Sequence, residues 1–114
     1  MIRVGIVGAE NSHTVAIAKV LNVTKRVPGA RVTHVWGETS AYAHAAADAG
    51  HIPDIVSRAE QMIGEVDGVV VDHRHPVEHL PAAKPFLEAG LPLFVDKPFC
   101  YRTTEGRRFI ARAK

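Results

Sequence analysis

The chain alternates between short apolar runs and longer stretches in which apolar residues recur every third or fourth position. Short runs are typical of strands, whereas the longer spacing is typical of helices that bury one face. We expect strands at 3–7, 31–36, 55–56, 68–71 and 93–95, and helices near 12–21, 40–49, 59–63, 80–89 and 104–113. The run 68–71 is continuous and β-branched, as in a strand covered on both faces. This alternation predicts an α/β fold with a doubly wound parallel sheet and right-handed crossovers.

Several residues mark the expected ends of helices. Ser12 or Asn11 can cap the first helix, because a side-chain oxygen at that position accepts a hydrogen bond from a free backbone N–H. For the same reason Ser40 is expected to cap the second helix, which Gly50 should close. Pro85 lies inside the fourth helix, where its missing N–H should produce a kink.

The composition is that of one globular domain. The chain has 114 residues, which is long enough for a single ordinary core. Hydrophobic residues make up 46% and charged residues 23%, which excludes disordered and membrane classes. A net charge of +2 with scattered basic residues gives little support for nucleic-acid binding, and no apolar stretch is long enough to span a bilayer. With no secretory signal and a lone cysteine, Cys100, we expect a cytoplasmic protein.

Candidate chemistry is concentrated in the tripeptide Asp96-Lys97-Pro98, which directly follows the last expected strand. In open α/β sheets the carboxyl edge is where ligands bind. A proline after Lys97 restricts the backbone of the lysine to extended values, which fixes the direction of its side chain. The sequence therefore places an ammonium group of fixed direction at the edge where ligands bind. The alternative is a charge pair that merely ends a strand on a solvated edge.

The loop 8–13, after the first expected strand, is a candidate phosphate-binding loop. Such a loop turns backbone N–H groups toward a pyrophosphate and needs glycines where the chain turns tightly. Gly8 matches the first glycine, whereas Glu10 and His13 stand where the second and third belong. A carboxylate ~4 Å from a phosphate costs about 4 kcal/mol at an effective dielectric near 20, so Glu10 must point away, or binding is weak or absent. Ser12 and His13 could still hold a phosphate; alternatively, they only begin the helix.

An acidic residue, Glu38, follows the second expected strand, where dinucleotide-binding folds hold the adenosine ribose. If Glu38 takes the ribose hydroxyls, NAD is favoured over NADP, because the carboxylate repels a 2′-phosphate. The alternative is a solvated loop acid that helps to cap the helix near Ser40. Trp36 is expected to pack at the end of its strand, although stacking on adenine stays open.

A cluster of histidines, His73, His75 and His79, follows the fourth expected strand together with Asp72. Three imidazoles and a carboxylate could suit zinc or iron. Metal-dependent amidohydrolases start from a similar strand end, but the spacing here is one residue short. Their barrel also needs at least ~200 residues. We therefore predict no metal site, and the other interpretation is that His73 and His75 are solvated while His79 begins the next helix.

Four segments together resemble the N-terminal dinucleotide-binding domain of the glucose–fructose oxidoreductase and inositol dehydrogenase family (Gfo/Idh/MocA). They are 4–8, 66–71, 86–90 and the Asp-Lys-Pro tripeptide 96–98, and the resemblance covers essentially the whole chain. It implies a single Rossmann-type domain over 1–114 that binds a nicotinamide dinucleotide. In the family the tripeptide is usually Glu-Lys-Pro, and its lysine reaches the nicotinamide ribose and the substrate hydroxyl. The resemblance thus implies a catalytic Lys97 and a cis peptide bond before Pro98.

The resemblance also assigns roles to the histidine segment. His79 falls at the family histidine beside the cofactor, and Arg74 could supply positive charge to the pyrophosphate. The full set of predicted cofactor-binding residues is Gly8, Asn11, Ser12, His13, Glu38, Arg74, His79, Asp96, Lys97 and Pro98.

Members of this family carry a second domain that holds the catalytic Asp/His pair and most of the substrate pocket. We therefore expect a truncated oxidoreductase module for a sugar or polyol-type hydroxyl, inactive by itself, with substrate bound only alongside a second domain. The alternative is a non-catalytic module that has lost dinucleotide binding and serves in binding or oligomerisation. Unfinished sheet edges favour a homo-oligomer in either case.

Overall fold

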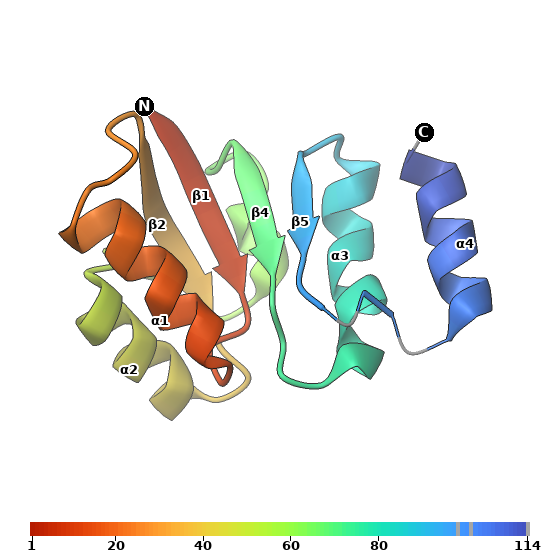
Figure 1. The fold of residues 1–114 in the computed structure, drawn as a ribbon, viewed down its shortest axis with the longest axis horizontal. Coiled ribbons are helices and arrows are strands. Elements are labelled where there is room, and N and C mark those ends of the chain that lie inside the picture. The colour runs from red at the N-terminus through yellow and green to blue at the C-terminus, as the bar shows by residue number, and fades with distance from the viewer. Residues whose placement is uncertain (98, 101, 114) are drawn as a thin grey trace.

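Parallel strands form the centre of the molecule, and helices cover both faces of the sheet (Figure 1). The computed structural model describes residues 1–97, 99–100 and 102–113, and for Pro76 the backbone alone. The strands are β1 Ile2–Val7, β2 Ala30–Trp36, β3 Asp54–Ile55, β4 Gly68–Val71 and β5 Leu93–Val95. The helices are α1 Ser12–Ala18, α2 Ser40–Gly50, α3 His79–Glu88 and α4 Thr103–Ala113, with shorter helical turns η1 Lys19–Val23, η2 Ala59–Met62 and η3 Pro76–Glu78.

The sheet has the order β3-β2-β1-β4-β5, and every neighbouring pair is parallel. The chain runs outward from β1 through β2 to β3 and then returns to the other side of β1 with β4. The strand order therefore reverses between β1 and β4, which is the position where open α/β sheets bind ligands. The predicted doubly wound α/β fold is confirmed.

Two apolar clusters, one on each face, hold the sheet between its helices. Alternate side chains of a strand point to opposite faces, so Ile6 joins the cluster beneath α1 and α2, whereas Val7 joins the cluster beneath α3. Val69 and Val71 are buried in the second cluster, while Val70 packs against the first. The prediction that 68–71 is covered on both faces is confirmed.

Two expected features of α2 are wrong. Its N-cap is Thr39, whose hydroxyl accepts from the Tyr42 N–H, and Ser40 is the first helical residue. Its C-cap is His51, which adopts the left-handed conformation at φ +54°, so Gly50 does not close the helix. Gly50 is required for a different reason: a Cβ there would collide with the Cβ of Ala18 in α1. Its small size lets α1 and α2 lie side by side (Figure 1).

Two other helices differ from the prediction in type. The segment expected as one helix over 12–21 is α-helical to Ala18 and continues as the π-helical turn η1. This turn carries Asn22, whose side-chain amide bonds both the N–H and the C=O of Val32 on β2. The helix expected near 59–63 is the 3₁₀ turn η2, which ends before Gly64 at φ +89°. Among the described residues, no helix is long and apolar enough to cross a membrane.

Candidate functional site at the carboxyl edge of the sheet

Four strands deliver a polar or flexible residue to the same edge of the sheet, around the point where the strand order reverses. Gly8 follows β1, Glu38 follows β2, Asp72 follows β4 and Asp96 follows β5. Because all strands are parallel, their carboxyl ends meet at one edge. Three carboxyl groups therefore surround the loop that begins at Gly8.

Gly8 has a backbone conformation that side chains rarely adopt, with φ at +123°. A Cβ added to it would lie 2.6 Å from Oδ1 of Asp72 and 2.8 Å from the backbone nitrogen of His73. Both the conformation and the lack of space therefore demand glycine. The tight turn expected at Gly8 is present.

Glu38 binds the loop directly. Its Oε1 accepts hydrogen bonds from the backbone N–H groups of Ala9 at 2.7 Å and of Glu10 at 3.0 Å. Glu38 does not supply the cap of α2, which is Thr39. Within the described part of the chain, its other oxygen, Oε2, is buried and has no hydrogen-bond partner. One carboxylate oxygen thus holds the loop, and the other is left with unused hydrogen-bonding capacity.

Glu10, which stands at the place of the second loop glycine, forms an ion pair with Arg74. Nη1 of Arg74 lies 3.6 Å from Oε1 of Glu10. The Glu10 side chain is 17% exposed, and that of Arg74 is 66% exposed. The charge that would repel a phosphate is therefore partly compensated within the protein, by the same arginine that was predicted to attract the pyrophosphate.

His13, Asn11 and Asp96 form a second polar group beside the loop. Nδ1 of His13 lies 2.5 Å from Oδ2 of Asp96, and the Asn11 amide donates to the same oxygen at 3.4 Å. The Asn11 side chain also caps α1 by accepting from the His13 N–H. Burial raises the pKa of Asp96, but the hydrogen bonds from His13 and from the Lys97 N–H outweigh burial, so the net pKa lies below the ordinary value.

The remaining predicted residues lie around this group. Ser12 is the exposed first residue of α1, and Lys97 is exposed directly after Asp96. Lys97 donates its backbone N–H to Oδ1 of Asp96 at 2.8 Å. Pro98 and its predicted cis peptide bond lie outside the described residues. The structure thus brings Asn11, His13, Asp96 and Lys97 together at the end of β5.

Asp72 is the most deeply buried acid at this edge, with 0% of the residue exposed. Its Oδ2 lies 2.6 Å from the hydroxyl of Thr14, and that hydroxyl also lies 2.9 Å from the carbonyl oxygen of Gly8. Burial raises the pKa of Asp72 to about 7, and the charges of Asp96 and Glu38 add to the rise; a hydrogen bond donated by Thr14 to the ionised carboxylate acts in the opposite direction. Sequence reasoning did not single out Asp72 and Thr14 as a pair.

His73 is buried at 4% exposure, so its interpretation as a solvated loop residue is wrong. His75 is exposed and His79 begins α3, as the same interpretation expects. Burial lowers the pKa of His73, which favours the neutral imidazole. The Nε2–H of the fully buried His79 donates to the carbonyl of His73 at 2.7 Å. This hydrogen bond ties the segment after β4 to the first residue of α3.

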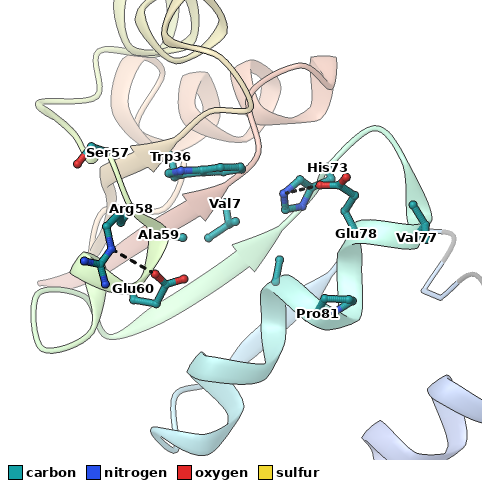
Figure 2. Close-up of a pocket in the computed structure, with 11 residues that line it drawn as sticks. Val7, Trp36, Ser57, Arg58, Ala59, Glu60, His73, Val77, Glu78 and Pro81 are labelled. Carbon is teal, nitrogen blue, oxygen red and sulfur yellow. Dashed lines mark ion pairs between the residues drawn. The ribbon is translucent and has the colours of Figure 1, made fainter.

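A cavity of about 630 Å³, here called the Trp36 pocket, opens between the ends of β2 and β4 (Figure 2). Trp36 and His73 form its inner wall, with ring centroids 5.4 Å apart, and Glu78 and Pro81 lie on the side of α3. Residues 57–60 form the opposite side, where Arg58 and Glu60 pair at 3.8 Å.

A smaller cavity of about 260 Å³, here called the Glu38 pocket, adjoins the Trp36 pocket and shares Trp36, His73 and Glu78 with it. Glu10 and Glu38, on the side of the loop, and His75 complete this pocket. In the described residues, Nδ1 of His73 is buried and has no hydrogen-bond partner. The two pockets thus form one groove, in which Trp36 and His73 line both parts and Glu10 and Glu38 line only the smaller part.

The Trp36 pocket was not predicted as a whole. Part of its inner wall was predictable, because Trp36 ends β2 and His73 follows β4. No sequence signal placed 57–60 across the pocket from α3. As for the metal alternative, no group of three or more His, Cys, Asp or Glu side chains that could hold a metal ion lies within the described ranges.

A sequence model of the Gfo/Idh/MocA oxidoreductase family, described as an NAD-binding Rossmann fold, matches residues 2–114. A comparison with curated protein sequences gives no match.

Solved structures similar to this chain share its fold at low sequence identity. One is a myo-inositol dehydrogenase from Lactobacillus casei in complex with NAD(H) and myo-inositol, with a TM-score of 0.84 and 20% identity over 98% of this chain and 33% of that chain. Another is a probable dehydrogenase from Thermotoga maritima, with a TM-score of 0.83 and 18% identity over 98% and 33% of the two chains. A third is a biliverdin reductase from Synechocystis sp. PCC 6803 in complex with biliverdin and NADP+, with a TM-score of 0.77 and 21% identity over 98% and 34%. The chain therefore spans about a third of the length of these structures.

Proposed function

The chain belongs to the Gfo/Idh/MocA oxidoreductase family, NAD-binding Rossmann fold, and from this premise we propose that residues 1–114 form the nucleotide-binding domain of an oxidoreductase acting on a sugar or polyol-type hydroxyl. The observation that carries the proposal is the groove at the reversal of strand order, lined by Glu38 and His73, each of which has a buried atom without a hydrogen-bond partner among the described residues. Buried polar atoms are usually satisfied. A polar ligand in the groove would satisfy them once each side chain turns its closed-off atom toward the groove.

In this proposal the adenine lies in the Trp36 pocket. A volume of about 630 Å³ falls in the range of small-molecule sites, and the indole of Trp36 offers an aromatic face. A neutral His73 can either donate or accept through Nδ1, and the purine edge carries both kinds of partner. The ribose would then lie in the adjoining Glu38 pocket.

NAD is the proposed cofactor, because of Glu38. Its Oε1 is engaged by the loop N–H groups, which orients the carboxylate. Its Oε2, which is closed off from solvent, is assigned to the hydroxyls of the adenosine ribose after a turn of the carboxylate toward the pocket. A 2′-phosphate in the same place would meet a like charge. The similar structures include one with NAD(H) and one with NADP+, so the choice rests on Glu38 itself.

The pyrophosphate is proposed to lie against the loop, near Asn11, Ser12 and His13. Arg74 would then exchange its contact with Glu10 for the phosphates, or share its charge between the two. Its high exposure leaves the guanidinium accessible from solvent. The nicotinamide end would lie toward Asp96 and Lys97. Lys97 is proposed to polarise the substrate oxygen, and Pro98 to fix the direction of the lysine side chain. His79 is proposed to support this edge from the interior, through its hydrogen bond to the carbonyl of His73.

The direct test is a titration of the chain with NADH and with NADPH by calorimetry and by quenching of tryptophan fluorescence. Trp36 is the only tryptophan, so quenching reports on the proposed adenine pocket itself. We expect saturable NADH binding, weaker NADPH binding, and no turnover of a polyol by the 114 residues alone. Preference for NADPH would refute the role given to Glu38.

Glu38→Gln separates the charge from the shape of the side chain. We expect NADH affinity to fall about tenfold, equivalent to about 1.4 kcal/mol, and NADPH to lose less, because repulsion of the 2′-phosphate disappears. Glu65→Gln, a change at an exposed acid outside both pockets, is the matched control and should leave both affinities unchanged. Equal losses for NADH and NADPH would contradict the assignment.

One observation favours the second candidate, a family member without dinucleotide binding. The loop N–H groups of Ala9 and Glu10 are already engaged by Glu38, so the protein supplies its own anion there. Glu10→Gly distinguishes the two candidates. Tighter NADH binding by this variant supports a working but weakened loop, whereas no binding by either chain supports a scaffolding or oligomerisation module.

A further inference from the structure

The hydroxyl of Thr14 has two oxygen neighbours but only one proton. It lies 2.6 Å from Oδ2 of Asp72 and 2.9 Å from the carbonyl oxygen of Gly8. A backbone carbonyl can only accept, and an ionised carboxylate can also only accept. If Asp72 were ionised, three oxygens at hydrogen-bond distance would share one proton. If Asp72 carries a proton, it donates to Thr14, and Thr14 donates to Gly8, so both short contacts are hydrogen bonds.

The surroundings of Asp72 also disfavour its ionised form. In the described residues, its Oδ1 is buried without a hydrogen-bond partner, and an unsatisfied charged oxygen costs more than an unsatisfied neutral one. The acids that act on it are Glu38, after β2, and Asp96, after β5. The imidazole of His13 in α1, half-exposed and 2.5 Å from Oδ2 of Asp96, acts in the opposite direction. The next residue, His73, is buried, and burial lowers the pKa of its imidazole. The imidazole of His73 is therefore favoured as the neutral form.

Asp72 also lies against the loop on which the proposed function depends. Its Oδ1 would be 2.6 Å from a Cβ on Gly8, so the carboxyl group touches the turn from the interior. The chain of hydrogen bonds from Asp72 through Thr14 ends on the Gly8 carbonyl and fixes the orientation of that peptide. Ionisation would remove the donor and place a negative charge beneath a loop proposed to face phosphates.

We propose that Asp72 is a positioning residue that is held as the neutral acid, donates through Thr14 to Gly8, and must keep its proton for the dinucleotide to bind. That Asp72 is neutral and donates to Thr14 stands on the geometry. That its proton is needed for dinucleotide binding rests on the proposed function. A ligand that binds only the protonated form has full affinity at low pH and loses affinity as the pH rises through the pKa of the carboxyl group.

The experiment is NADH binding by the full 114-residue chain between pH 5.5 and pH 8.5, compared with Asp72→Asn. With the pKa of Asp72 at about 7, the wild-type affinity is expected to fall about tenfold between pH 6 and pH 8. In Asp72→Asn the amide still donates to Thr14 and cannot ionise, so this fall should disappear. His13 and His73 remain in both chains, so the difference between the two profiles isolates Asp72.

Two further measurements make the outcome unambiguous. Asp48→Asn, at an exposed position on α2, is the control and should keep the wild-type profile. The ¹³C carboxyl signal of Asp72, assigned by its loss in Asp72→Asn, should titrate near pH 7 in the free chain. A midpoint below about pH 5, or identical binding profiles for wild type and Asp72→Asn, would overturn the inference while NADH binding itself stands. If neither chain binds NADH at any pH, the proposed function and the coupling both fall, and the carboxyl titration alone decides whether Asp72 is neutral.

Discussion

Replacement of Asp72 by asparagine should stabilise the domain at neutral and alkaline pH. In the wild type, burial raises the pKa of Asp72 from 3.8 to about 7. The folded state therefore binds the proton more tightly than the unfolded state does. This contribution to stability is fully present below pH 3.8, and it is lost progressively as the pH rises to about 7. Asparagine has no such proton to lose.

The size of the effect follows from the two pKa values. Each pH unit between them changes the free energy of unfolding by about 1.4 kcal/mol, so the whole interval corresponds to about 4 kcal/mol. The stability of Asp72→Asn relative to wild type should therefore rise by about 3 kcal/mol between pH 5 and pH 8. Above pH 7 the difference should be constant, because both states of the wild type are then ionised at this position.

The assay is urea unfolding of both chains at pH 5, 6, 7 and 8, followed by circular dichroism. The difference in the free energy of unfolding at each pH removes the contributions of other titrating groups, which the two chains share. A difference that stays constant from pH 5 to pH 8 would refute the reasoning, since it would mean that Asp72 is already ionised at pH 5 in the folded protein.

Three further predictions concern the fold. Gly8→Ala should lower the free energy of unfolding in urea by about 3 kcal/mol or more, because of strain at positive φ and overpacking against Asp72. Gly29→Ala is the control and should be nearly neutral, because a Cβ there would have no atom within 4 Å. Thr39→Ala should cost about 1 kcal/mol through loss of the α2 cap, and a larger loss for Ser40→Ala would contradict the assignment of the cap. Phe86→Ala removes a fully buried side chain and should cost about 3–5 kcal/mol in the same assay; a loss below 1 kcal/mol would argue against a packed core beneath α3.

The sequence predicted the sheet well, because strand formation here depends on short-range pattern. The runs 68–71 and 93–95 coincide with β4 and β5, and the expected first and second strands each begin one residue after the observed start. Helix ends were less predictable. The choice between Ser40 and Thr39 as a cap depends on backbone geometry, which residue type alone does not specify.

The sequence predicts which residues lie at the strand ends of the site, but not which of their side chains contact one another. Parallel strands guarantee that Gly8, Glu38, Asp72 and Asp96 meet at one edge, and the sequence locates each of them. The sequence does not reveal that Glu38 turns toward the loop N–H groups or that Arg74 pairs with Glu10. Those contacts depend on side-chain directions set by residues far apart along the chain.

Hydrogen bonds tie the loop after β1, residues 8–10, to the end of β2 and to Glu38 just after it. The N–H groups of Gly8, Ala9 and Glu10 donate in succession to the Trp36 carbonyl and to Glu38. Three consecutive amides in a stretch without regular secondary structure should therefore exchange with deuterium as slowly as those of a strand. The two connections behave mechanically as one rigid element, so an insertion after Trp36 would displace the glycine turn although nearly thirty residues separate them in the chain.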